Sequence, residues 1–211
     1  GELATFGRTF DSMVEVVDLH IAEIEAAKTA LAEQAESLQH EQQRSEKLLL
    51  NVLPAAIADR LKNGEDTIAE SYPEVTVLFS DIVGFTEMSA RIGAKQVVDM
   101  LNEVFGLLDE LAEKHSIEKI KTIGDCYMVV AGVPDRSPTH AQQIAAFALD
   151  MQKTLKAYGE HSGRSLSMRT GVHTGTVVAG IVGTSKFAYD LWGDVVNIAS
   201  RMESSSEAGR I

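Results

Sequence analysis

One stretch near the middle of the chain, residues 75–86, constrains the fold more than any other. Residues 75–79 are apolar or β-branched without interruption, which predicts a strand buried on both faces. The strand ends near Asp81, a carboxylate that is costly to bury unless it meets a cation or a hydrogen-bond donor. The turn that follows contains glycine, and it can present the backbone N–H groups of Val83, Gly84, Phe85 and Thr86 to a ligand. A metal-bound phosphate suits this combination; the alternative is that Asp81 only caps a following helix.

Composition limits the classes of function. The 211 residues carry a formal charge of −12, which argues against a nucleic-acid-binding protein, because phosphate backbones require basic patches. Cys126 is the only cysteine, so an intrachain disulfide is impossible and a reducing compartment is expected. No apolar run is long enough to cross a bilayer. The fragment is therefore expected to be soluble. A full-length protein is expected to be anchored in a membrane, with this fragment at its cytoplasmic face.

The N-terminal quarter predicts a long helix that associates with a second copy. Residues 14–50 contain no glycine or proline, and one seam position per heptad is mostly apolar: Val17, Ile24, Leu31, Leu38, Ser45 and Val52. The other seam positions are mixed, so residues 14–50 predict a weak, dimerising coiled coil. The alternative is a solvated helix that lies on its own domain. Residues 1–13 resemble the closing helix of a HAMP module through the stripe of Leu3, Phe6, Phe10 and Met13, although an ordinary amphipathic helix has the same stripe.

Proline and glycine divide the rest of the chain. Pro54 is expected to end the long helix, and residues 55–61 predict a short helix that stops at Asn63 and Gly64. We assign residues 51–71 to a connector and residues 72–211 to a globular domain. Helices are predicted there at 94–115, 138–158 and 194–203, and strands at 75–79, 117–123, 127–131, 166–173, 177–182 and 187–191. This order predicts an α+β domain of ferredoxin-like type, with an antiparallel sheet and helices on one face.

A second aspartate lies at a predicted hairpin turn. Asp125 follows Gly124 between two apolar strands. Gly-Asp turns are common without any function. If this hairpin lies beside the first strand, however, Asp81 and Asp125 converge, and two carboxylates at one point need a divalent cation to offset their repulsion. Two-metal sites of this kind hold phosphates and lower the pKa of an attacking hydroxyl.

Four blocks of the chain are similar to the signature blocks of the class III nucleotidyl cyclases. They are residues 79–86, 119–128, 168–175 and 189–203, and the resemblance spans residues 72–211. It implies the cyclase fold and two Mg²⁺ or Mn²⁺ ions held by Asp81 and Asp125, with the Ile82 carbonyl assisting. One ion would activate the ribose 3′-hydroxyl and the other would hold the β- and γ-phosphates. The resemblance also implies that Arg169 contacts the phosphates.

The same resemblance assigns catalysis and base selection. Asn197 and Arg201 match residues that orient the ribose and neutralise charge at the α-phosphate. They are four residues apart and share one helix face, and arginine offers a fixed fork of donors, although Arg201 alone is also compatible with a surface salt bridge. Lys121 and Asp190 match the pair that recognises adenine in adenylyl cyclases, and Leu191 belongs to the same substrate-binding set. Guanylyl cyclases carry glutamate and cysteine-like residues at the two paired positions, so both positions favour ATP.

These assignments predict an adenylyl cyclase that makes cyclic AMP and pyrophosphate from ATP. In the family the metal aspartates come from one protomer and the remaining site residues from its partner, so we expect a homodimer with two sites. Relatives usually continue past Ile211 into strands that carry another phosphate-binding lysine. Guanylyl cyclase is a rival of the same chemistry, and a non-catalytic nucleotide-binding or dimerisation module is a rival of another class. The N-terminal helix is expected to transmit a signal from an upstream sensor or membrane module by changing dimer geometry.

Overall fold

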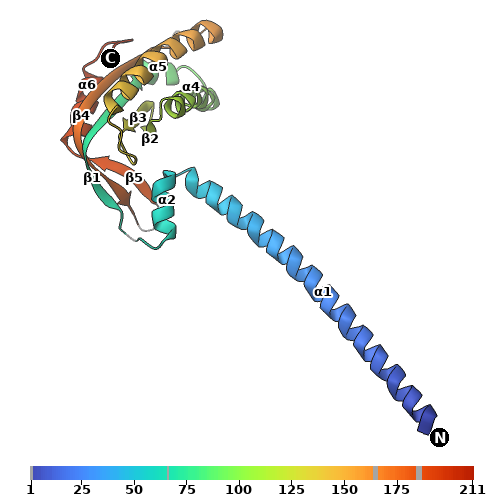
Figure 1. The fold of residues 1–211 in the computed structure, drawn as a ribbon. Helices are drawn as coiled ribbons and strands as arrows, with labels where there is room; N and C mark the ends of the chain where they lie inside the picture. Colours follow the sequence, from blue (N-terminus) through green and yellow to red (C-terminus); the bar gives the residue numbers. More distant parts are fainter. Residues whose placement is uncertain (1, 66, 164–165, 184–186) are drawn as a thin grey trace. The chain divides into compact units, whose positions relative to one another are not determined.

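The computed structural model describes residues 2–65, 67–163, 166–183 and 187–211 (Figure 1). The chain forms two compact units, residues 1–51 and residues 52–211. Within the part of the chain that is described, no helix combines the length and the apolar character needed to span a membrane.

The first unit is a single helix, α1 (Glu2–Leu50). Four of its predicted seam residues, Val17, Ile24, Leu31 and Leu38, are each at least 47% exposed in the single chain. An exposed apolar stripe contributes little to the stability of an isolated helix, because most helix stability comes from burying such a face. The long helix is therefore confirmed, and its stripe is available to a second helix. The dimer itself stays a prediction.

The segment that follows α1 packs into the second unit. Helix α2 (Ala55–Lys62) begins directly after Pro54, as predicted. Leu53, Ile57 and Ala58 are buried, and the Arg60 guanidinium donates hydrogen bonds to Glu65 and to Glu70 of the first strand. The residues assigned to a connector thus share the compact unit of the globular domain, and its first strand already begins at Ala69.

Five antiparallel strands form the sheet of the second unit, in the order β2-β3-β1-β4-β5. Their bounds are β1 (Ala69–Ile82), β2 (Glu118–Ile123), β3 (Cys126–Ala131), β4 (Met168–Val182) and β5 (Ala188–Trp192). The two strands predicted at 166–173 and 177–182 are one strand, β4. The Thr-Gly-Thr stretch between them stays extended because its backbone continues the ladder with β1, where Gly175 lies opposite Val75.

Two long helices cover one face of the sheet (Figure 1). They are α4 (Ala94–Lys114) and α5 (His140–Ser162), and they pack against alternate residues of the central strands. Leu78 and Val129 from the sheet meet Leu108 and Phe147 from the helices in this core. Each such side chain contributes roughly 1.5–3 kcal/mol by leaving water. The predicted α+β class with an antiparallel sheet is confirmed.

The last helix, α6 (Asp194–Ser204), lies on the opposite face of the sheet, so the expectation of helices on one face was incomplete. Leu78 pairs with Val172 in the core under α4 and α5, and the next pair, Phe79 with Gly171, therefore faces the other way. A Cβ at Gly171 would lie 2.0 Å from the backbone nitrogen of Glu203 in α6. The helix packs directly on β4 because a side chain is missing there, and a pattern of apolar residues does not reveal such a contact.

Candidate active site

An ion-pair chain joins three elements at the end of β1. Asp81 lies opposite Arg169 in the ladder between β1 and β4, on the face that carries α6. Arg169 Nη2 donates to Asp81 Oδ2 at 2.8 Å, and Arg169 Nε donates to Glu203 Oε1 at 2.6 Å. The Glu203 carboxylate, with a smaller effect from Asp81, raises the pKa of Arg169. The register of the central strands thus holds a charged arginine between two carboxylates.

Asp125 reaches the same point from the neighbouring hairpin. Cys126 lies opposite Asp81 in the ladder between β1 and β3, which brings the turn before Cys126 to the end of β1. Burial raises the pKa of Asp125 to about 6, together with the charge of Asp81 and a hydrogen bond between the two carboxyl groups. The two aspartates therefore converge as the sequence predicted, and the charge of Asp81 disfavours the ionisation of Asp125.

The donors at this point fit a hard divalent cation that binds together with phosphate. Mg²⁺ is usually held by one or two carboxylates plus substrate phosphates, which matches Asp81, Asp125 and the neighbouring Ile82 carbonyl. Within the described ranges, no group of three or more His, Cys, Asp or Glu side chains could hold a metal by itself. Burial, with the charge of Asp81, raises the pKa of Cys126 to about 12, so this thiol stays protonated and is a poor ligand.

The turn after β1 leads into a short helix, α3 (Phe85–Ser89). Gly84 occupies the N-cap position with φ of 73°, a left-handed conformation that favours glycine. Asp81 is therefore not the cap, and the capping interpretation is wrong. The N–H groups of Phe85 and Thr86 lie in the first turn of α3, where helices leave N–H groups without internal partners. The Val83 N–H instead donates to the Ser167 carbonyl at 2.9 Å, so it is not open to a ligand as the sequence suggested.

Lys121 and Asp190 meet although their strands form opposite edges of the sheet. Lys121 Nζ donates to Asp190 Oδ2 at 2.5 Å, and the other carboxylate oxygen accepts the Leu191 N–H at 2.9 Å. These two bonds fix the orientation of the Asp190 carboxylate. The side chains are 41% and 23% exposed, so the charged pair remains accessible to a ligand.

Helix α6 has a buried face and an exposed face. Val195, Ala199 and Glu203 recur every four residues and are buried. Asn197 and Arg201 have the same spacing two residues further along, which places them on the side away from β4, and both are exposed. Asn197 and Arg201 therefore point away from the buried face of α6, which is the face that meets β4 near Asp81 of the same chain.

Sequence reasoning missed Glu203. Its carboxylate is only 7% exposed, and it holds Arg169 from the buried face of α6. The signal that could have found it is a carboxylate at a position where the helical stripe calls for an apolar residue. A buried carboxylate needs a cationic partner or strong donors, so this position indicates an ion pair with a residue of the sheet.

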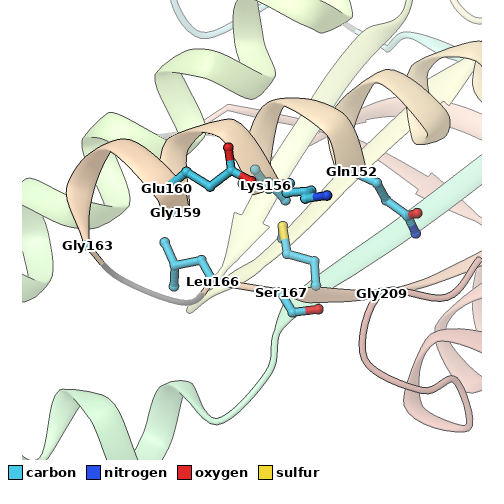
Figure 2. A pocket seen from close by; sticks show the side chains of 10 residues that line it. Gln152, Lys156, Gly159, Glu160, Gly163, Leu166, Ser167 and Gly209 are labelled. Carbon is cyan, nitrogen blue, oxygen red and sulfur yellow. The ribbon is translucent and has the colours of Figure 1, made fainter.

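A pocket of about 610 Å³ lies beside this site, between α5, the start of β4 and Gly209 (Figure 2). Ser167 and Met168 contribute to its wall. Met168 lies opposite Ile82 of β1, and the Ser167 carbonyl accepts the N–H of Val83 in the turn after β1. None of the sequence-predicted site residues lines the pocket. Glu160 is the only carboxylate residue in its described lining, so the pocket lacks the facing carboxylates found at Asp81 and Asp125.

The fold is that of a nucleotide cyclase catalytic domain: the chain belongs to the family described as the adenylate and guanylate cyclase catalytic domain, whose model matches residues 67–211. An adenylate cyclase of Mycobacterium tuberculosis is 48% identical over 184 residues, which cover 87% of this chain and 41% of the relative. A membrane guanylyl cyclase of Dictyostelium discoideum is 41% identical over 175 residues, 82% of this chain and 12% of the relative. The chain thus spans less than half the length of these curated relatives.

Solved structures show the same fold. The adenylyl cyclase CyaB from P. aeruginosa matches with a TM-score of 0.64 and 33% identity over 67% of this chain and 76% of that chain. The catalytic core of a rhodopsin-guanylyl cyclase with converted specificity, in complex with ATPalphaS, matches with a TM-score of 0.64 and 42% identity over 67% and 77%. Adenylate and guanylyl cyclases both occur among these relatives, so membership of the family does not by itself determine which base is bound.

Proposed function

We propose that this chain is the catalytic part of an adenylyl cyclase, which converts ATP to 3′,5′-cyclic AMP and pyrophosphate. The observation that carries the choice of ATP is the hydrogen-bonded pair of Lys121 and Asp190. An ammonium can donate to adenine N1, and a carboxylate can accept from the exocyclic amine. Guanine presents the opposite pattern and would leave buried polar groups unpaired. The mycobacterial relative is an adenylate cyclase, which supports the proposal.

At the other end of the site, Asp81, Asp125 and the Ile82 carbonyl are proposed to hold two Mg²⁺ or Mn²⁺ ions. Such ions, when bound, lower the pKa of the ribose 3′-hydroxyl and neutralise the phosphates. Arg169 is proposed to exchange its bond to Asp81 for a phosphate oxygen, while Glu203 keeps its Nε–H in place. The backbone from Gly84 to Thr86 lies beside the same phosphates.

Asn197 and Arg201 are proposed to act from a second protomer. Asn197 orients the ribose, and Arg201 stabilises the negative charge that develops at the α-phosphate when the 3′-oxygen attacks in line. Both side chains lie on the exposed face of α6, where a partner chain can present them. Within the described residues, no hydrogen bond joins the Lys121–Asp190 pair to the Asp81–Arg169 pair.

We therefore propose a symmetric homodimer in which the aspartates of one protomer face Lys121, Asp190, Asn197 and Arg201 of its partner. The exposed seam of α1 is a further surface on which the two chains could associate. Through α1, an upstream sensor or membrane module is proposed to change the geometry of the dimer. The guanylyl cyclase domain of a Blastocladiella emersonii fusion protein has been solved both as a non-canonical dimer and as a monomer.

The test is product formation by the purified chain with ATP or GTP, each in the presence of Mg²⁺ or Mn²⁺. We expect cyclic AMP from ATP to form faster than cyclic GMP from GTP. A preference for GTP would support guanylyl cyclase. It would also overturn the assignment of Lys121 and Asp190 to adenine recognition. The absence of any product, repeated with a chain extended past Ile211, would favour a non-catalytic nucleotide-binding or dimerisation module.

A further inference from the structure

The strand that carries Lys121 is irregular at one residue. In the ladder between β2 and β3, Lys119 lies opposite Val129 and Lys121 lies opposite Met128. Ile120 therefore has no partner of its own, which makes it the extra residue of a β-bulge. Bulges change the direction in which the following side chains point.

The bulge places the two lysines on opposite faces of the sheet. Val129 belongs to the core under α4 and α5, whereas its neighbour Met128 faces the side that carries α6. Residues that lie opposite each other share a face, so Lys119 faces α4 and Lys121 faces the other side. In a regular strand, two residues separated by one would share a face. Without the bulge, Lys121 would point toward α4, on the face that carries Lys119.

Each lysine meets a carboxylate on its own face. Lys119 Nζ donates to Asp109 Oδ2 of α4 at 2.7 Å and lies 5.3 Å from the centre of the Tyr127 ring. The Tyr127 hydroxyl donates to the other Asp109 oxygen at 2.6 Å. Asp109 thus binds both strands of the hairpin: Lys119 in β2, one residue before the bulge, and Tyr127 in β3. Lys121, two residues further along β2, pairs instead with Asp190 of the edge strand β5.

We propose that the bulge at Ile120, held by Asp109, Lys119 and Tyr127, is the device that positions Lys121 for base recognition. Asp109 and Lys119 are positioning residues: they bind each other on the face that carries α4, and they act on the base through Lys121. The proposal rests on the proposed function, because it explains how the base-selecting lysine reaches its place.

The decisive variants are Lys119→Met and Asp109→Asn. Both retain size and shape and remove the ion pair, whereas deletion of Ile120 risks unfolding the hairpin. We expect KM for ATP to rise more than kcat falls, and the ratio of kcat/KM for ATP over GTP to fall about tenfold, the worth of one hydrogen bond. The matched control is Lys114→Met, which removes a similar ion pair away from the hairpin: Lys114 of α4 pairs with Asp150 of α5 at 3.0 Å. Its ratio should equal that of the wild type.

A double-mutant cycle separates positioning from general loosening. If Asp109 acts through Lys121, Asp109→Asn should change the ATP-to-GTP ratio in the wild type and leave it unchanged in a Lys121→Ala background. An equal effect in both backgrounds, or a lower melting temperature with an unchanged ratio, would overturn the proposal. If the wild type forms cyclic AMP, either of these results would reject the positioning role of Asp109 and leave the proposed function intact. If it forms no cyclic nucleotide, the proposed function fails first, and equal affinities of Asp109→Asn and wild type for a fluorescent ATP analogue would overturn the positioning role separately.

Discussion

The two ends of the candidate site are built in different ways. At the metal end, Asp81 and Arg169 lie opposite each other on the two central strands, and Glu203 reaches them from a helix packed without intervening side chains. At the base end, Lys121 and Asp190 come from the two edge strands, and one of them is directed by an irregular residue. Regular strand pairing places the residues of the metal end, whereas the base end depends on the bulge at Ile120.

This difference suggests where such a domain can vary. A change at the centre of the sheet disturbs pairing on two sides, so the residues that carry the chemistry are tied to the stability of the fold. Edge strands pair on one side only, and a substitution or a shifted bulge there alters which groups meet the base while the centre is preserved. If the proposed function is right, substitutions at the edge strands should therefore change base preference without abolishing the reaction.

The largest effect is expected from the metal end. Asp81→Ala combined with Asp125→Ala should lower kcat by about a thousandfold or more, because metal-assisted charge stabilisation is worth several kcal/mol. Cyclic AMP formation measures the loss, and sedimentation checks that the oligomeric state is unchanged. Asp99→Ala, at an exposed position of α4, is the control and should retain activity. Normal turnover by the double variant would refute the metal assignment.

A smaller effect, on preference, is expected from the base end. Lys121→Glu with Asp190→Cys should lower the ratio of kcat/KM for ATP over GTP by about 10–100-fold, because each mismatched polar group costs about 1–3 kcal/mol. The dependence on Mn²⁺ should stay as in the wild type, since the aspartates are untouched. Lys153→Glu, an exposed change on α5, should leave the ratio unaltered. If the exchanged pair still prefers ATP to the same degree, the base is read elsewhere.

The packing of α6 provides a test of the central strands through stability. Gly171→Ala should lower the free energy of unfolding by about 1–3 kcal/mol, because the new Cβ meets backbone that cannot move aside easily. Gly106→Ala in α4 is the matched control. No atom lies within 4 Å of its added Cβ, and alanine favours a helix by up to about 1 kcal/mol. Urea unfolding should therefore show a lower free energy of unfolding for Gly171→Ala and an equal or higher one for Gly106→Ala. Equal changes in the two variants would contradict the close contact at Gly171.

The smallest expected effect concerns pH and the edge strand β2. Burial, with a smaller contribution from Asp135, raises the pKa of Glu118 to about 7. The folded protein therefore binds this proton more tightly than the unfolded chain, and the associated stability, complete below the unfolded pKa of about 4.5, is lost as pH rises through about 7. Glu118→Gln should reduce the loss of melting temperature between pH 5 and 8. Exposed Glu110→Gln should follow the wild type, and identical curves for all three proteins would show that Glu118 is not responsible.

The sequence predicted the metal end better than the base end. Asp81 closes an uninterrupted apolar run and Asp125 follows a glycine at a hairpin turn, so local patterns locate both, and strand pairing then brings them together. Lys121 and Asp190 were found only through resemblance to a family. Their contact joins opposite edges of the sheet and requires the bulge at Ile120, and neither feature leaves a local signal.

Glycines account for two further differences between prediction and structure. The position of α6 depends on Gly171, where the absence of a side chain creates the contact, and hydrophobic periodicity detects only side chains that are present. The continuity of β4 depends on backbone pairing through Gly175, a residue type that usually indicates a break. Glu203 is a different case, because its place in a buried helical stripe could have been recognised.

The ion-pair chain at the metal end has a consequence for electroneutrality. Asp81 and Glu203 bind one guanidinium, Arg169, and Asp125 lies beside Asp81, so three carboxylates and one cation leave two negative charges when all are ionised. This is the charge that a single divalent ion cancels. A nucleoside triphosphate is also strongly anionic, and the chain as a whole carries −12. Under the proposed function, approach of the nucleotide is opposed unless a cation beyond the one that accompanies it is present. Turnover should then follow the concentration of uncomplexed divalent ion as well as that of the metal–nucleotide complex.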